Sequence, residues 1–339
     1  VNIFYQTTPS CTTAITGKAT VTVRPTPTAG ISGTTTVCED GTAPVITFSN
    51  PQVLPITISY KINSGSTSTV NVAASSTATV TAPTSTAGTY DYTLVSVIYQ
   101  DNTPGCSTAL STKATITVLP TPTASISGGT SVCKDGTAPI VTFSNPQTLP
   151  ITVTYKINTG SNLTIDVPAS GSSTVSAPTG TVGSFVYSIS SVAYQATPAC
   201  TNAVSGSTTI IVRPIPTATI GGTIEVCQNS TSPKITFTNP QAFSVRITYK
   251  INTGSNQTIN VGANASATVD APTGTAGKFD YNLVSVRYQS GASCSNSITG
   301  KATVTVRPTP TATISGATSV CKDDLAPDIT FANPQILPI

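Results

Sequence analysis

The chain has 339 residues, of which only 8% are charged, with a net charge of +3 and no His, Met or Trp. Nucleic-acid binding needs clustered Lys and Arg, so this composition excludes it. Thr, Val, Ile, Ser and Ala dominate, which favours β structure over disorder, and no apolar run approaches the roughly 20 residues of a membrane-spanning helix.

One pattern recurs along the whole chain. A dipeptide ending in proline begins each copy, at Arg24, Leu119, Arg213 and Arg307, so the repeat is about 94 residues long. This spacing predicts complete copies at residues 24–118, 119–212 and 213–306, the end of a preceding copy at residues 1–23, and the start of a following copy at residues 307–339. We expect further repeats on both sides. About 94 residues can bury one core, so each copy is predicted to be a domain.

Each copy opens on a proline-rich step, such as Arg24-Pro25-Thr26-Pro27. Proline fixes φ and favours extended polyproline geometry. Only about four residues precede the first strand, a span of about 12 Å at about 3.1 Å per residue, and residues 28–31 are expected to belong to that strand already. The step is therefore predicted to be a stiff joint in a semi-rigid rod.

Apolar and polar residues then alternate along the copy. Ile46 and Phe48 have apolar counterparts in every repeat, whereas the position of Val45 holds Lys234 and Asp328 in later ones, which is the pattern of a half-buried strand. Similar patterns predict strands at residues 56–62, 70–72, 77–80, 90–99 and 114–118.

The longest of these strands, at residues 90–99, changes phase in its middle. Its apolar side chains occupy even positions before Val95 and odd positions after Ser96, which predicts a β-bulge there. About seven short strands per copy, separated by turn residues and without helical periodicity, predict an all-β chain of tandem antiparallel β-sandwich domains.

The cysteines recur twice in each repeat, which indicates disulfides and an oxidising compartment. Pairing within domains gives Cys38–Cys106, Cys133–Cys200 and Cys227–Cys294, and leaves Cys11 and Cys321 to partners outside this chain. We favour this pairing because each closed loop of about 68 residues would add about 2–4 kcal/mol to a small domain. The simplest sandwich topology places the two cysteine loops at opposite ends, so this pairing requires a short or broken first strand.

Two other arrangements of the cysteines remain open. Pairing across the proline boundary would give Cys11–Cys38, Cys106–Cys133, Cys200–Cys227 and Cys294–Cys321, each over almost a domain length. A zinc site would need the same thiolates, but the chain has no His and no Cys-x-x-Cys spacing.

Three other sets of recurring residues invite a functional interpretation. Outward lysines suit an isopeptide cross-link or, more simply, a solubilising role on a strand: Lys61, Lys156 and Lys250. Residues two places after a cysteine suit a weak calcium site or, more simply, a turn: Asp40, Asp135, Asn229 and Asp323. Tyrosines of inward phase suit the core better than a sugar-stacking surface: Tyr60, Tyr155 and Tyr249.

Nothing in the sequence marks a catalytic centre. The chain has no His, no acid pair at a recurring spacing and no Gly-rich phosphate loop before a helix. We therefore expect no enzyme activity, no catalytic residues, no metal and no cofactor.

The order of short motifs within each copy resembles a known family. It runs P-T-x-x-I-S-G, V-C-x-D/G, G-x-[YF]-x-Y-x-[LI]-x-S-V, a cysteine, and A-T-[VI]-T-V. This order is similar to the PKD-like or Ig-like tandem repeats of very large cell-surface adhesins from gliding, Bacteroidota-type bacteria, and the resemblance covers the whole chain. It implies Ig-like or PKD-like sandwiches in an elongated rod, type IX secretion, and an extracellular location attached to the outer membrane.

The predicted function is a structural stalk or spacer in a large exported adhesin for surface adhesion and gliding motility. The implied partners are an extracellular surface or polysaccharide, gripped by other parts of the protein, and the outer-membrane gliding and secretion machinery. No nucleic-acid partner and no membrane span in this chain are expected. The alternative is that the repeats themselves bind glycans or a partner protein, which a shared exposed aromatic or polar cluster would favour; the outward positions show none.

Overall fold

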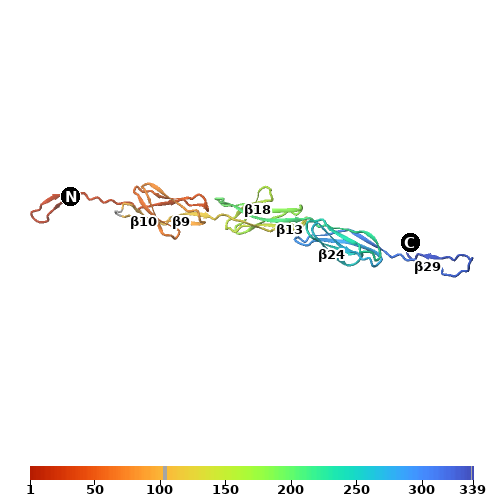
Figure 1. Cartoon of the computed structure of the whole chain (residues 1–339). Helices are drawn as coiled ribbons and strands as arrows, with labels where there is room; N and C mark the ends of the chain where they lie inside the picture. Colours follow the sequence, from red (N-terminus) through yellow and green to blue (C-terminus); the bar gives the residue numbers. More distant parts are fainter. Residues whose placement is uncertain (102–104, 337) are drawn as a thin grey trace.

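The computed structural model describes residues 1–101, 105–336 and 338–339. Strands form the regular secondary structure of these residues, and among them there is no helix with the length and apolar character needed to cross a membrane. The chain is drawn out into a row of three β-sandwiches between two terminal hairpins (Figure 1). The hairpins are β1 (Asn2–Phe4) with β2 (Thr12–Ala14), and β29 (Thr313–Ser315) with β30 (Thr330–Ala332).

The three sandwiches repeat the same series of strands. Sandwich 1 contains β3 (Gly30–Ser32), β4 (Thr35–Cys38), β5 (Val45–Asn50), β6 (Ile56–Ile62), β7 (Thr67–Val72), β8 (Ser76–Thr81), β9 (Gly88–Tyr99), β10 (Ser107–Ala109) and β11 (Lys113–Leu119). Sandwich 2 contains β12 (Ser125–Ser127), β13 (Thr130–Cys133), β14 (Ile140–Ser144), β15 (Ile151–Ile157), β16 (Leu163–Val167), β17 (Ser172–Ser176), β18 (Gly183–Tyr194) and β19 (Thr201–Arg213). Sandwich 3 contains β20 (Thr219–Gly221), β21 (Ile224–Cys227), β22 (Lys234–Asn239), β23 (Val245–Ile251), β24 (Asn256–Val261), β25 (Ala265–Asp270), β26 (Gly277–Tyr288), β27 (Ser295–Ser297) and β28 (Lys301–Arg307).

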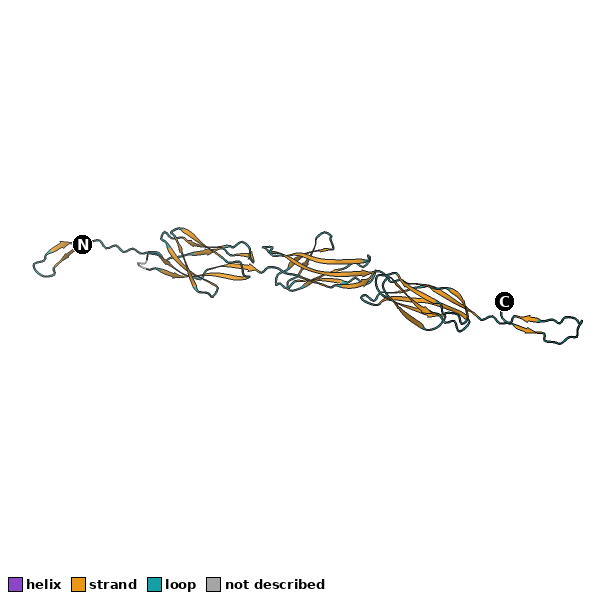
Figure 2. Ribbon diagram, in the orientation of Figure 1, coloured by secondary structure: helices purple, strands orange, loops and turns teal. Residues whose placement is uncertain are grey.

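Each sandwich packs a small sheet against a larger one (Figure 2). In sandwich 1 the small sheet has the order β3-β5-β8, and the large sheet has the order β4-β11-β9-β6-β7, with β10 beside β9. Sandwich 3 repeats this order with its own strands, and sandwich 2 does so with the single long strand β19 in place of β10 and β11. Two mostly antiparallel sheets with the first strand shared between them make an Ig-like fold. The predicted all-β, Ig-like class is confirmed.

The first strand of each sandwich is broken, and its two parts lie in different sheets. β3 pairs antiparallel with β5, whereas β4 pairs in parallel with β11. Gly33 lies at the break with φ at 115°, a conformation that residues with a Cβ rarely adopt. The break therefore depends on glycine. Gly128 and Gly222 repeat it in the other sandwiches, and Gly316 has a similar angle in the C-terminal hairpin.

The alternation of residues seen in the sequence becomes the core. Ile46 and Phe48 are fully buried, and the Phe48 ring packs on Tyr60 with the ring centroids 4.8 Å apart. Each sandwich has its own cluster of buried apolar side chains. The predicted bulge is confirmed, because Ser59 pairs with Ser96 whereas the next residue, Tyr60, pairs with Leu94 and leaves Val95 over.

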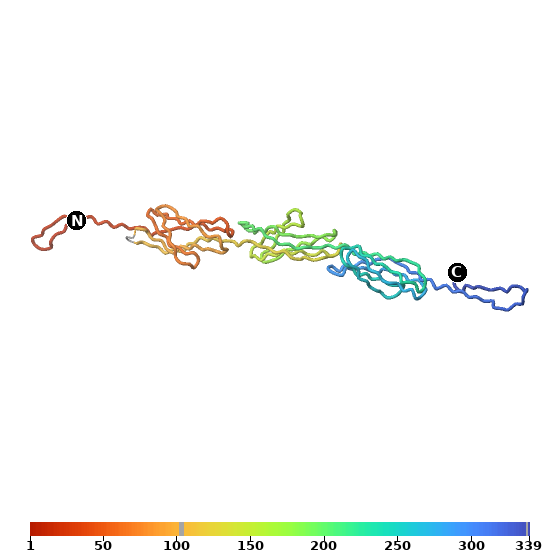
Figure 3. The backbone as a smooth tube through the Cα atoms, in the orientation of Figure 1, coloured from red at the N-terminus to blue at the C-terminus, as the bar shows by residue number. Residues whose placement is uncertain are grey.

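The broken strand gives each sandwich two different poles. β4 and β11 run in the same direction and end together, with Leu119 opposite Cys38, at what we call the exit pole. The entry pole receives the incoming chain, where the Tyr99 hydroxyl donates a hydrogen bond of 3.2 Å to the Pro25 carbonyl. Figure 3 shows the backbone entering each sandwich at one end and leaving at the other.

Candidate functional site: the joints between sandwiches

The disulfides connect different sandwiches. Cys38 is bonded to Cys200 and Cys133 to Cys294, with Cα–Cα separations of 5.5 Å in both bridges. The predicted bridges Cys38–Cys106, Cys133–Cys200 and Cys227–Cys294 are therefore wrong, and so is the pairing across the proline boundary. Each observed bridge links the first cysteine of one sandwich to the second cysteine of the next.

The correction follows from where the two poles lie. The first cysteine ends the parallel strand, so Cys38 lies at the exit pole beside Leu119. The second cysteine precedes the last strand, so Cys106 and Cys200 lie at the entry poles of their own sandwiches. Two cysteines of one sandwich are thus separated by the length of its last strand, whereas Cys38 meets the entry pole of sandwich 2.

The remaining cysteines have no disulfide partner within the residues that the structure describes: Cys11, Cys106, Cys227 and Cys321. Cys106 is half-buried at the entry pole of sandwich 1, and Cys227 is exposed at the exit pole of sandwich 3. That Cys11 and Cys321 pair outside this chain stays a prediction.

A glutamine at the entry pole of each sandwich holds the incoming linker against that sandwich. At the joint between sandwiches 1 and 2, the Gln147 side chain accepts a hydrogen bond from the Thr123 backbone amide at 3.3 Å and donates one to the Thr123 hydroxyl at 2.7 Å. Gln52 and Gln241 hold Thr28 and Thr217 in the same way. We call this contact the glutamine clasp.

A buried asparagine supports each clasp. Asn145 is 2% exposed, and its amide donates to the carbonyls of Leu149 and Pro168, both at 2.9 Å. Its side-chain oxygen accepts the backbone amide of Gln147 at 2.9 Å, which fixes the turn that presents the clasp. Asn50 and Asn239 make the corresponding bonds.

The residue before the linker proline packs against the next sandwich. Leu119 lies against the core of sandwich 2. Arg213 is only 9% exposed, stacks on the Phe243 ring at 4.1 Å, and donates to the Ser290 carbonyl at 2.6 Å. These side chains fill the space between neighbouring poles, so both joints are packed as well as bonded.

One carboxylate adds a charged contact to the first joint. Glu39 directly follows Cys38 and accepts a hydrogen bond from the backbone amide of Thr121, in the linker, at 3.0 Å. This bond, joined by ones from the Thr121 hydroxyl and the Ala87 amide, lowers the pKa of Glu39 below its usual value. Lys134 and Gln228 occupy the corresponding positions, so this contact belongs to one joint only.

The other recurring residues take the simpler roles considered for them. Tyr60, Tyr155 and Tyr249 are buried, which confirms that they are core residues. Lys61, Lys156 and Lys250 are exposed, which does not fit the buried lysine that an isopeptide bond needs. A left-handed backbone, typical of turns, is found at Asp40, Asp135, Asn229 and Asp323. Within the described ranges, no three acidic or cysteine side chains gather where they could hold a metal ion.

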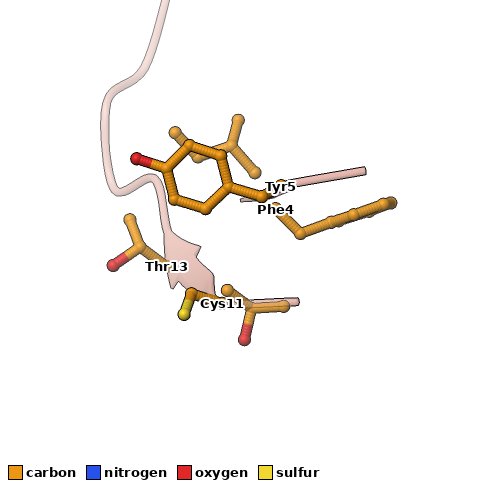
Figure 4. Close-up of a pocket in the computed structure, with 6 residues that line it drawn as sticks. Phe4, Tyr5, Cys11 and Thr13 are labelled. Atoms are coloured by element: carbon orange, nitrogen blue, oxygen red, sulfur yellow. The ribbon is translucent and has the colours of Figure 1, made fainter. Parts of the chain in front are cut away.

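A hollow in the N-terminal hairpin exposes residues of core type (Figure 4). Tyr5, which lines it beside Cys11, is 71% exposed, whereas its counterparts Tyr99 and Tyr288 are buried in complete sandwiches. The hollow thus exposes a tyrosine whose counterparts are core residues in the complete sandwiches.

Sequence reasoning missed the residues that build the joint. The triplet Asn-Pro-Gln occurs in every copy, beginning at Asn50, Asn145, Asn239 and Asn333, and this recurrence was the available signal. In the sequence, a recurring polar triplet after a strand looks like an ordinary turn. Its role is visible only in the structure, because the glutamine side chain bonds to a residue 24 positions away.

Comparison with solved structures finds similar chains at low sequence identity. The chain is similar to the Ca²⁺-stabilized adhesin with which an Antarctic bacterium binds ice, at 19% identity over 87% of this chain and 78% of that one, with a TM-score of 0.34. It is similar to invasin, a bacterial integrin-binding protein, at 14% identity over 86% of this chain and 61% of that one, with a TM-score of 0.34. A stretch of three titin domains matches at 12% identity over 84% and 98%, with a TM-score of 0.42. No model of a known protein family matches, and no curated protein matches.

Proposed function

We propose that the chain is part of the stalk of a very large exported surface adhesin, in which clamped sandwiches hold adhesive parts away from the cell. The observation that carries this proposal is the joint, which recurs with the same disulfide, glutamine clasp and packed side chain. Such a joint limits bending between neighbours, which a spacer needs. The disulfides also suit an extracellular location.

The finer parts of the proposal rest on the order of motifs in the sequence. That order resembles the repeats of the gliding-motility adhesin SprB. It supports export by type IX secretion, attachment to the outer membrane and its gliding machinery, and a role in movement over surfaces or polysaccharides. The domain boundaries at residues 24–118, 119–212 and 213–306 belong to the same proposal.

The pairing rule extends this proposal to neighbouring repeats. Cys106 occupies the place that Cys200 and Cys294 have in later sandwiches, and Cys227 occupies the place of Cys38 and Cys133. In a longer array, Cys106 would bond to the first cysteine of the preceding repeat, and Cys227 would bond to the second cysteine of the following one.

Electron microscopy of the purified chain tests the stalk. We expect straight rods with correlated sandwich orientations in oxidising buffer, and a broader distribution of angles after reduction. Uncorrelated orientations in the oxidised sample would contradict the proposal.

A recurring hollow is the one observation that favours the alternative, glycan binding by the repeats themselves. In sandwich 2 it is lined by Ser144, Ser170 and Ser172, and in sandwich 1 by Ser49, Ser75 and Ser76. A glycan array with the whole chain tests this. Saturable binding that is lost in Ser76→Trp/Ser172→Trp, which fill the hollows, would replace the spacer function by a binding one.

A further inference from the structure

The two disulfides change the path along which tension travels through the chain. Sandwich 1 is entered through its linker, and the chain then follows β3 and β4 to Cys38. From Cys38 the covalent path crosses directly to Cys200 in the next sandwich. Strands β5 to β11 therefore lie outside the shortest covalent route.

Sandwich 3 is bypassed in the mirror-image way. Tension that reaches Cys133 crosses to Cys294, and from there only β28 separates it from the next linker. From Arg24 to Cys38, and from Cys294 to Arg307, the chain has about 14 residues. At about 3.4 Å per residue this is about 48 Å, close to the about 40 Å that the longest strands already span. Unfolding either outer sandwich would thus add almost no length.

The middle sandwich is where the two clamps meet. Cys200 holds its entry pole and Cys133 holds its exit pole. Tension between these two cysteines acts on β19 and β13, which are adjacent parallel strands paired from Thr130 with Ile210 to Cys133 with Arg213. The two strands are pulled in opposite directions along their length, so their hydrogen bonds are loaded together in shear.

We propose that the disulfides form a mechanical bypass: in this chain a sandwich bridged at one pole carries no unfolding load, and sandwich 2, bridged at both poles, is the one that extends under tension. This load-bearing function goes beyond the proposed stalk role and does not depend on what the whole protein adheres to. If sandwich 2 yields, the shortest remaining connection between the clamps is the chain from Cys133 to Cys200, about 67 residues or about 240 Å of contour at about 3.6 Å per residue.

Single-molecule pulling of the full chain by tags at its two ends, attached without cysteine chemistry, tests the bypass. In oxidising buffer we expect one unfolding step of about 200 Å, because the folded sandwich already spans about 40 Å of the released contour of about 240 Å. After reduction, three steps of about 300 Å each are expected, because each repeat then releases about 94 residues, or about 340 Å of contour, of which the folded sandwich already spans about 40 Å. Three full-length steps from the oxidised chain, or the same pattern before and after reduction, would overturn the proposal.

Two matched variants separate the clamps. In Cys133→Ser/Cys294→Ser only sandwich 3 remains outside the bypass, and in Cys38→Ser/Cys200→Ser only sandwich 1 does. Each variant is expected to show a single step of about 300 Å, longer than the single step of about 200 Å in the parent chain. Circular dichroism before pulling checks that the sandwiches of each variant are folded. If a variant does not fold, the reduction experiment on the parent chain still tests the bypass. Three steps from a folded, oxidised variant would contradict the bypass. If the step sizes are as expected but microscopy shows flexible rods, the bypass stands and only the proposed stalk function is rejected.

Discussion

At the scale of single residues, the joint depends on polar side chains with different degrees of burial. Asn145 is buried and donates hydrogen bonds to two carbonyls, whereas Gln147, two residues later, makes its hydrogen bond at the surface. A buried amide is costly to remove because its partners lose their hydrogen bonds without gaining water. An exposed amide is replaced by water at little cost, so the two residues should separate stability from joint stiffness.

We predict that Asn145→Ala lowers the unfolding free energy of sandwich 2 by about 2–3 kcal/mol, since the carbonyls of Leu149 and Pro168 lose their donor. The matched variant Gln147→Ala should cost less than about 1 kcal/mol and should instead broaden the angle at the joint. Calorimetry measures the first effect and small-angle scattering the second. Equal melting temperatures for the two variants would contradict this assignment.

The Glu39 carboxylate gives the first joint a dependence on pH. Its pKa is lowered in the folded chain, mainly by the Thr121 amide, so its stabilising contribution is complete above the unfolded pKa and is lost as pH falls through the folded pKa. A titration followed by NMR should find the Glu39 pKa below 4.5, and Thr121→Pro, which removes the amide, should move it upward. A pKa at or above 4.5 in the parent chain would show that the contact does not form in solution.

At the scale of elements, the broken first strand decides where the cysteines lie. Were β4 to continue β3 in the small sheet, Cys38 would not end beside Leu119 at the exit pole. The glycine at the break makes the transfer between sheets possible, because its backbone adopts a conformation that a Cβ would oppose. In sandwich 3 this residue is Gly222, with φ at 104°.

Two neighbouring glycines make a sharp test of the break. A Cβ on Gly222 would lie 2.5 Å from the Lys234 carbonyl oxygen, whereas a Cβ on Gly221 would meet nothing within 4 Å. We predict that Gly222→Ala destabilises sandwich 3 by about 1–3 kcal/mol and that Gly221→Ala changes its stability by less than about 1 kcal/mol. Urea denaturation measures both. Similar midpoints for the two variants would mean that the break does not require glycine.

At the scale of the whole molecule, covalent bonds join sandwiches that are already packed end to end. Each bridge spans about 162 residues of sequence but only one joint in space. Because sandwich 2 takes part in both bridges, its stability should depend most strongly on the disulfides. We therefore expect the same two bonds to limit both bending and extension of the chain.

Digestion under non-reducing conditions, followed by mass spectrometry, tests the connectivity directly. We predict cross-linked peptides that contain Cys38 with Cys200 and Cys133 with Cys294, and none that contain Cys38 with Cys106. A reduced and alkylated sample is the control. Peptides with Cys133 bonded to Cys200 would restore the pairing within one sandwich and remove the bypass.

Much of the fold follows from local pattern. The sequence alone predicts the alternation at Ile46 and Phe48 and the phase change at Val95. Both depend only on which side of a sheet a residue faces. The sequence does not predict the bonding partners of Asn145 and Cys38 in this way. Asn145 reaches carbonyls on a neighbouring loop, and Cys38 reaches another sandwich, so both depend on how the strands are arranged in three dimensions.

The sequence by itself determined the repeat, the all-β class and the buried face of each strand, because each of these depends on residue type and short-range spacing. Only the tertiary structure decided the disulfides. Their regular spacing fits several pairings equally well, and the choice depends on the direction of one short strand. Since β4 runs parallel to β11, it carries its cysteine to the exit pole, where the nearest partner belongs to the next sandwich.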